Sequence, residues 1–239
     1  MSWRERLQSS DPMPIRAHVF RCTLVSSVLA ALLALPTPAA AQQERSVERR
    51  PIGWFAADAR VSLPRYKQDP GVAAAAGVAA ENLPGRGLGL AAGAHVYPLR
   101  TRRIALGFGA EILTSRGSNT LEPATEGAPD GPTVETRFSA FSPQVSLNFG
   151  ASEGWSYLSG GIGWSTMSVR QETSPVPSDG WPRRSTINYG GGARWFMNPH
   201  LAFSFDLRFY KVDAQEPDAV YPAMPATTMM VFSGGLSFK

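Results

Sequence analysis

Cysteine is almost missing from this sequence of 239 residues. The single cysteine, Cys22, lies near the start, and none follows it. A disulfide needs two thiols and a cysteine-ligated zinc site needs several, so both are excluded. A thiol nucleophile is excluded for everything after residue 22.

Long hydrophobic runs are missing as well. The longest, TLVSSVLAALLAL (23–35), is shorter than the roughly 20 residues that a membrane-spanning helix needs. Arg16 and Arg21 precede this run, and the small-residue tripeptide AAA (39–41) follows it. This order of basic, apolar and small residues predicts a signal peptide over residues 1–41, in preference to a short buried helix. Met13 is an alternative start of the chain.

Lysine is scarce, and the formal charge of +4 comes mainly from arginine. The arginines are scattered through predicted turns and alternating positions, and they form no basic stripe. Because a nucleic-acid interface gathers its basic residues on one face, we expect no nucleic-acid partner.

Histidine is also rare, and only His95 and His200 follow the predicted signal. Ser204 lies four residues after His200, about 13 Å along a strand, which is out of hydrogen-bond reach. No HExxH motif is present, and the glycine run GLGLAAG (87–93) does not fit GxGxxG. We therefore predict no catalytic, cofactor-binding or metal site and no enzymatic activity, with lipid modification as the one reaction class left open.

What the sequence does contain is alternation with period two. In LAFSFDLRFY (201–210), apolar residues occupy every odd position and mostly polar ones every even position, which indicates a β-strand with two unlike faces. Eight segments follow this pattern: 54–63, 87–97, 104–113, 137–149, 155–165, 185–196, 201–210 and 228–238. Pro143 lies inside the fourth segment and predicts a bulge or a locally broken ladder there.

The connections between these segments alternate in length. The long ones are 64–86, 114–136, 166–184 and 211–227, and the short ones are 98–103, 150–154 and 197–200. In an up-and-down meander, long loops then gather at one end and short turns at the other, as in transmembrane barrels. The sequence therefore predicts an all-β, eight-stranded antiparallel up-and-down transmembrane β-barrel over residues 54–239, with four long outer loops and three short periplasmic turns. Residues 42–53 are polar and predict a flexible periplasmic lead-in.

The polar face of the predicted strands suits a narrow lumen better than a solvent surface. It carries many glycines and serines, interleaved with large residues such as Trp54, Tyr157 and Arg194. Six charged residues on this face balance in sign and are expected to form a structural polar network in the lumen: Asp58, Arg60, Glu111, Arg194, Asp206 and Arg208. The alternative is that these six are ordinary surface charges of a soluble, lipocalin-like barrel whose apolar face points inward.

The apolar face is then expected to contact lipid. Strands of about 9–11 residues tilted near 45° cover a hydrophobic band ~25 Å tall. Aromatic residues near the predicted strand ends are expected to form the interfacial girdles of such a band: Tyr66, Phe149, Trp155, Trp164 and Trp195. Arg183 and Arg184, beside Trp181, suggest a contact with lipopolysaccharide phosphates, although a solvated loop pair is the simpler interpretation.

With these strands and loops, and with the ending MVFSGGLSFK (230–239), the chain resembles the small outer-membrane barrels of the OmpA/OmpX type. The resemblance implies a Gram-negative-type outer membrane, with outer-membrane lipid and lipopolysaccharide as surroundings. It also implies an assembly signal for the barrel-insertion machinery, carried here by Phe232, Leu236 and Phe238. The family usually ends on an aromatic residue, and Lys239 after Phe238 departs from that pattern.

The fold does not settle the role of such a barrel. Because eight strands enclose a lumen just wide enough for their own side chains, we expect no open aqueous pore. The leading hypothesis is a monomeric structural or surface-interaction protein that acts through its long loops. The alternatives are a barrel that binds or passes a small hydrophobic ligand, which needs an apolar mouth, and the soluble lipocalin-like barrel.

Overall fold

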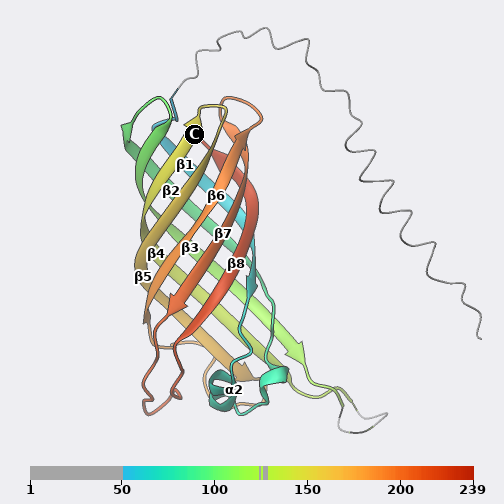
Figure 1. Ribbon diagram of the computed structural model, residues 1–239. Coiled ribbons are helices and arrows are strands. Elements are labelled where there is room, and N and C mark those ends of the chain that lie inside the picture. The colour runs from blue at the N-terminus through green and yellow to red at the C-terminus, as the bar shows by residue number, and fades with distance from the viewer. Residues whose placement is uncertain (1–50, 124, 126–128) are drawn as a thin grey trace, which may run out of the picture. The chain divides into compact units, whose positions relative to one another are not determined.

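Eight strands close into one barrel in the computed structural model of the chain, which describes residues 51–123, 125 and 129–239 (Figure 1). Each strand pairs antiparallel with its sequence neighbours, and β1 pairs with β8 to close the ring. The strands are β1 (Phe55–Arg65), β2 (Leu88–Arg100), β3 (Ile104–Thr120), β4 (Thr133–Ala151), β5 (Gly154–Gln171), β6 (Arg184–Phe196), β7 (Leu201–Val212) and β8 (Thr227–Phe238). This confirms the predicted eight-stranded up-and-down barrel.

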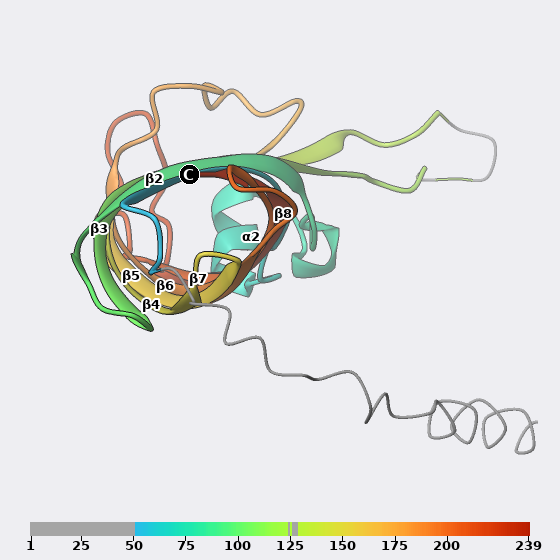
Figure 2. The same cartoon turned by 90° about the horizontal axis from the view of Figure 1, so that it is seen from above.

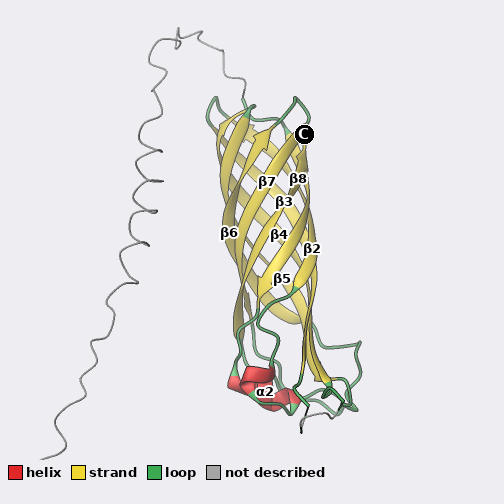
Figure 3. Cartoon of the chain, turned by 90° about the vertical axis from the view of Figure 1, so that its right-hand side faces the viewer, coloured by secondary structure: helices red, strands yellow, loops and turns green. Residues whose placement is uncertain are grey.

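The connections are sorted between the two ends of the barrel. Three short turns lie at one end, called here the turn end, and four long connections lie at the other, called here the loop end (Figure 3). The short helix α2 (Pro70–Ala76) and the 3-10 turn η1 (Ala80–Asn82) both belong to the connection between β1 and β2. No helix in the part of the chain that the structure describes is long and apolar enough to cross a membrane.

Three strands run further toward the loop end than the alternation predicts. β3, β4 and β5 are 17, 19 and 18 residues long, and the β3–β4 hairpin projects beyond the barrel wall (Figure 2). The extra residues are rich in Ser, Thr, Gly and charged side chains, and their few apolar members, Val134, Met167 and Val169, are buried in the interior. The outward apolar face that marks the rest of each strand is therefore missing there.

Two prolines disturb the ladders. β4 and β5 keep one register on both sides of Pro143 but skip Ser142 and Pro143, so the ladder is locally broken without a bulge. A one-residue register shift instead lies between Val96 and Leu99 of β2, around Pro98. Proline lacks an N–H and cannot donate to the ladder, which accounts for both irregularities.

The apolar strand face points outward. Leu158 and Ile162 of β5 are 62% and 68% exposed, whereas Arg194 and Arg208 are 1% and 2% exposed. A soluble protein that buried its charges and exposed its leucines would lose the hydrophobic contribution to folding. The lipocalin-like alternative, with the apolar face inward, is therefore wrong for this chain.

The interior contains two apolar clusters with polar residues between them. At the loop end, Phe138, Tyr210 and Met229 belong to a large buried cluster together with Val72 and Ala73 of α2. Viewed along the barrel, α2 lies across this opening (Figure 2). At the turn end, a smaller cluster forms around Tyr97, Ala105, Trp155 and Tyr157.

The helix α2 has clear local signals for its two ends. Asp69 is the N-cap and accepts a hydrogen bond from the Gly71 amide at 2.9 Å, and Pro70 occupies the first turn. Lys67 beside Asp69 and that amide hold the pKa of the carboxyl below its usual range. Gly77 ends the helix in the left-handed region, with φ of 68°, where a residue with a Cβ is strained.

The predicted N-terminal segments lie almost wholly outside the described residues. The signal peptide over 1–41 and most of the lead-in over 42–53 remain predictions. Of the last lead-in residues, Ile52 is buried in the turn-end cluster, and its carbonyl accepts a hydrogen bond from Arg100 at 3.3 Å.

The aromatic girdle is only partly as predicted. Phe149, Trp164 and Trp195 face outward, but Trp155 and Tyr66 are buried inside the barrel. Trp54, expected in the lumen, is instead 63% exposed because it precedes the first residue of β1. Trp155 shares the inward phase of Tyr157, and Tyr66 continues the inward phase of Arg60, so period two alone places both inside the barrel. Only Trp54, before the first residue of β1, departs from the phase of its strand.

Candidate functional site in the barrel interior

The six charged residues predicted to face the lumen lie in one layer of the barrel interior. They come from β1, β3, β6 and β7, and each is at most 5% exposed: Asp58, Arg60, Glu111, Arg194, Asp206 and Arg208. They occupy alternate positions of their strands, so period two carries all of them to the inner face. These six residues are called the lumen ion network below.

Glycines on neighbouring strands make room for the lumen ion network. Gly93 lies opposite both Asp58 and Glu111, while Gly192 and Gly190 lie opposite Asp206 and Arg208. The lumen of an eight-stranded barrel is narrow, so a larger side chain at these glycine positions would occupy the space that the long charged side chains fill. The glycines on the polar face therefore provide the space in which the charged side chains are enclosed.

Asp58 and Arg194 form the most regular pair of the network. The Arg194 Nε and Nη2 atoms donate to the two Asp58 carboxylate oxygens at 2.9 and 2.6 Å, a bidentate geometry. The Ser237 hydroxyl also donates to Asp58. The guanidinium of Arg194 lies 4.3 Å from the centre of the Tyr157 ring.

The other four charges form a cycle. Arg60 pairs with Glu111 and lies 3.7 Å from Asp206. Arg208 lies 3.0 Å from Asp206 and 3.2 Å from Glu111. Each guanidinium therefore contacts both carboxylates.

Two tyrosines that the sequence analysis left out of the network complete it. Tyr157 donates to Asp206 and Tyr210 donates to Glu111, each at 2.8 Å. The signal that places them is the same as for the charges, since both lie on the inward phase of their strands. With three acidic and three basic members, the network is neutral and hydrogen-bonded, as enclosed ions require.

Three inward rings lie against glycines of the adjacent strand. A Cβ atom at Gly107, Gly109 or Gly192 would come within 2.6 to 2.7 Å of the Tyr97, His95 or Tyr157 side chain, respectively. Only glycine leaves space for these rings on the inner face.

Neither His95 nor His200 is placed beside a nucleophilic hydroxyl. His95 is buried with neither ring nitrogen hydrogen-bonded, while His200, at the turn end, contacts the Lys239 carbonyl at 3.2 Å. Neither histidine hydrogen-bonds to a hydroxyl. Within residues 51–123, 125 and 129–239, no group of three or more His, Cys, Asp or Glu residues is placed to hold a metal ion.

The predicted assembly-signal residues face outward. Phe232, Leu236 and Phe238 of β8 are all exposed on the apolar face, with Phe238 next to Ala57 of β1. Lys239 turns over the rim, where its ammonium lies 3.8 Å from the centre of the Phe196 ring. The departure at Lys239 therefore leaves the outward phase of Phe238 intact.

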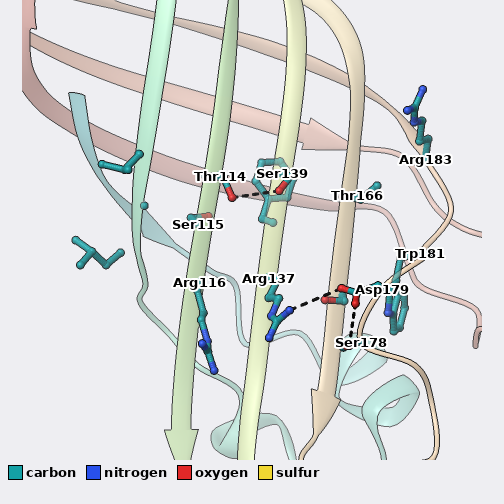
Figure 4. A pocket seen from close by; sticks show the side chains of 16 residues that line it. Thr114, Ser115, Arg116, Arg137, Ser139, Thr166, Ser178, Asp179, Trp181 and Arg183 are labelled. Atoms are coloured by element: carbon teal, nitrogen blue, oxygen red, sulfur yellow. Dashed lines mark hydrogen bonds and ion pairs between the residues drawn. The ribbon is translucent and has the colours of Figure 1, made fainter. Parts of the chain in front are cut away.

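A second candidate site is a groove of about 660 Å³ on the outer face near the loop end (Figure 4). It is lined by Arg116 and Arg137 from two strands and by Trp181 and Arg183 from the β5–β6 connection. The predicted Arg183–Arg184 pair is split, because Arg184 is 3% exposed and donates to the Asp213 carbonyl at 3.2 Å.

Solved structures are similar to this chain at low sequence identity. The sequence matches none of the curated proteins. Among solved structures, Neisserial surface protein A is 13% identical, covers 78% of this chain and 97% of its own, with a TM-score of 0.47. OprG from Pseudomonas aeruginosa is 11% identical, covers 80% and 97%, with a TM-score of 0.45. The outer membrane protease OmpT from Escherichia coli is 12% identical, covers 65% and 64%, with a TM-score of 0.41.

A family model settles the membership. The model for the outer membrane protein beta-barrel domain matches residues 27–237, which is most of the chain. The outward apolar face and the enclosed charges fit that membrane location. The chain belongs to the outer membrane β-barrel protein family.

Proposed function

We propose that this protein is a closed barrel that anchors its long loops at the cell surface and carries no open aqueous pore. The observation that supports the proposal best is the lumen ion network, which joins strands from opposite parts of the ring. The Asp58–Arg194 contact bridges residues 136 apart in sequence, and the Tyr210–Glu111 contact residues 99 apart. A filled cross-section leaves no continuous water path.

The apolar cluster at the loop end adds a second barrier. Phe138 and Tyr210 lie 5.6 Å apart between ring centres, and α2 covers them with Val72 and Ala73. An ion crossing this layer would lose its hydration without finding charged partners.

Conductance measurements test this proposal. Purified protein is inserted into a planar lipid bilayer in concentrated KCl, with a known porin as the positive control. The proposal expects no discrete current steps from the folded protein. Stable steps that depend on the amount of this protein would overturn it.

A second function, binding of a small hydrophobic ligand, is favoured by one observation. The loop-end half of the interior is apolar, as the ligand hypothesis requires, although α2 and neighbouring side chains fill it. The test is titration with the fluorescent probe N-phenylnaphthylamine. Saturable binding that Ala140→Trp removes by filling the compartment would support this function, and purely non-saturable uptake into detergent would rule it out.

We further propose that the outward-facing Phe232, Leu236 and Phe238 form the assembly signal and that the folded protein is a monomer. The side chains would be accessible to the insertion machinery before β8 closes against β1. Phe238→Ala is expected to slow assembly in vivo, with Phe209→Ala on β7 as the matched outward control. Equal assembly of both variants would contradict the signal, and sedimentation in detergent measures the oligomeric state.

A further inference from the structure

The turn between β2 and β3, called here the arginine turn, carries arginine at three of its positions. Arg100, Arg102 and Arg103 are all exposed, and Figure 2 shows this turn at the outer edge of the ring. The other two short turns, 150–154 and 197–200, contain no arginine or lysine and one acidic residue, Glu153. Among the three turns, positive charge therefore gathers in the arginine turn.

Acidic residues lie mostly at the opposite end of the barrel. Apart from the lumen ion network and Glu153, every acidic side chain that the structure describes lies in a long connection or in a strand end next to one. Arginines at the loop end thus lie among many carboxylates, whereas the arginine turn has one carboxylate side chain at its end of the barrel. Charge of one sign gathered in this way attracts ligands of the opposite sign.

The backbone of the arginine turn is held in one shape by Thr101. The Thr101 amide donates to the Ile104 carbonyl at 2.7 Å, and the Ile104 amide donates to the Thr101 hydroxyl at 3.0 Å. The Arg103 carbonyl accepts a hydrogen bond from the Gly150 amide at 2.9 Å, which ties the turn to the one between β4 and β5. Arg102 and Arg103 therefore extend from a preorganised backbone, which lowers the entropic cost of binding.

The guanidiniums of Arg102 and Arg103 are available to an external acceptor. No ion pair between residues that the structure describes involves either of them, whereas Arg116 and Arg137 at the loop end both contact Glu135. A guanidinium presents its donors in a planar fork that matches the oxygens of a phosphate. The chemistry of this turn therefore favours a phosphate group as the ligand.

Apolar side chains lie directly beside the arginine turn on the outer face. Leu99 and Ile104, which flank it, are 63% and 46% exposed. Leu99 pairs with Leu106 on β3, and Ile104 pairs with the outward-facing Phe149 on β4. The lipid-facing apolar belt thus continues up to the turn, and the arginines follow it at the level of the headgroups. A ligand that matches both parts has a phosphate at one end and acyl chains at the other.

We propose that the arginine turn binds an anionic phospholipid of the periplasmic leaflet. Arg102 and Arg103 would hold its phosphate, Arg100 would add positive charge, and an acyl chain would lie against Leu99 and Ile104. Clustered basic residues beside a membrane attract anionic lipids, so a zwitterionic phospholipid with the same phosphate should bind more weakly. The proposal rests on the outer-membrane location and not on a closed lumen, so a conducting barrel would leave it intact.

Native mass spectrometry of the full protein in detergent tests the site. Phosphatidylglycerol is added as the anionic probe, with phosphatidylethanolamine as the zwitterionic comparison. The variant Arg102→Gln/Arg103→Gln is compared with Arg86→Gln/Arg183→Gln, which removes the same charge from exposed positions at the loop end. We expect a loss of bound phosphatidylglycerol of about tenfold in the first variant only, and weak binding of phosphatidylethanolamine by the wild type.

A second measurement locates the bound lipid. A phosphatidylglycerol with a photoreactive diazirine in its acyl chain is bound to the wild type, irradiated and mapped by peptide mass spectrometry. Labels are expected in residues 98–106 and in the adjacent part of β4. Faster gel migration of the unboiled protein shows that each variant is folded, and Arg102→Gln alone replaces the double variant if that one is unfolded.

Three results would overturn the proposal. The first is equal binding of the two phospholipids by the wild type. The second is an equal loss of phosphatidylglycerol in both double variants, or no loss in either. The third is labelling that is confined to parts of the barrel away from the arginine turn.

Discussion

At the scale of single residues, the interior depends on a match between large side chains and glycines. The lumen ion network and the inward rings occupy space that glycines on the next strand leave free. Glycine weakens a strand on its own, so its frequency on the inner face reflects what lies opposite it. Substitution of either the enclosed side chain or the glycine opposite it is expected to lower the free energy of unfolding.

Removal of one charge from the network should destabilise the barrel. Asp58→Ala leaves Arg194, which is 1% exposed, without its bidentate partner. We expect a loss of about 3–5 kcal/mol in the free energy of unfolding, because an uncompensated buried charge remains. Urea unfolding in lipid vesicles, followed by tryptophan fluorescence, measures the change.

The control for this variant is Glu122→Ala, an exposed residue in the β3–β4 connection. It should leave the unfolding midpoint unchanged. If Asp58→Ala behaves like Glu122→Ala, the network does not stabilise the folded barrel.

Filling the space of an inner glycine should also be costly. A Cβ at Gly109 would lie 2.1 Å from the Ala94 carbonyl oxygen and 2.6 Å from the His95 ring. Gly109→Ala is expected to lower the free energy of unfolding by about 1–3 kcal/mol, since backbone and ring must both move. At Gly160 the nearest atom would be 3.5 Å away, so Gly160→Ala should fold and unfold like the wild type.

Much of the interior could be predicted at this scale. Period two and charge balance were enough to indicate the six charged residues. The specific pairs, such as Arg208 with both Asp206 and Glu111, could not be predicted, because they depend on the register of strands far apart in sequence. The inward position of Trp155 follows from period two, since Trp155 lies two residues from the inward Tyr157.

At the scale of elements, α2 separates the loop-end cluster from the outside. Its capping signals, Asp69-Pro70 at the start and Gly77 at the end, are visible in the sequence, and a helix there could have been predicted from them. The extended ends of β3, β4 and β5 could not, because they lack the outward apolar phase of the rest of each strand. Their pairing continues from the part of each ladder that does have one.

A charge on the buried face of α2 should release it. Val72 is 2% exposed in the loop-end cluster, so Val72→Asp should detach the helix and expose the connection between β1 and β2. Trypsin is expected to cleave after Lys67 and Arg86 at least tenfold faster, as mass spectrometry of the products would show. Ala74→Asp, on the exposed face of the same helix, is the matched control, and equal cleavage of the two variants would contradict the packing of α2.

At the scale of the whole molecule, the distribution of polar and apolar side chains is the reverse of that in a soluble protein. Its charges are enclosed and its leucines and phenylalanines are exposed to lipid. The loops are sorted by length between the two ends, and a groove lies on the outer face near the loop end. Every proposed function depends on this arrangement.

The measurement that tests this arrangement most directly is a spin-label scan along residues 201–210. Single cysteines are introduced into a Cys22→Ser background, and collision with oxygen, which dissolves in lipid, is measured in nanodiscs. The account predicts maxima at Leu201, Phe203, Phe205, Leu207 and Phe209 and minima at the even positions between them. Maxima at the even positions, or no alternation at all, would contradict it.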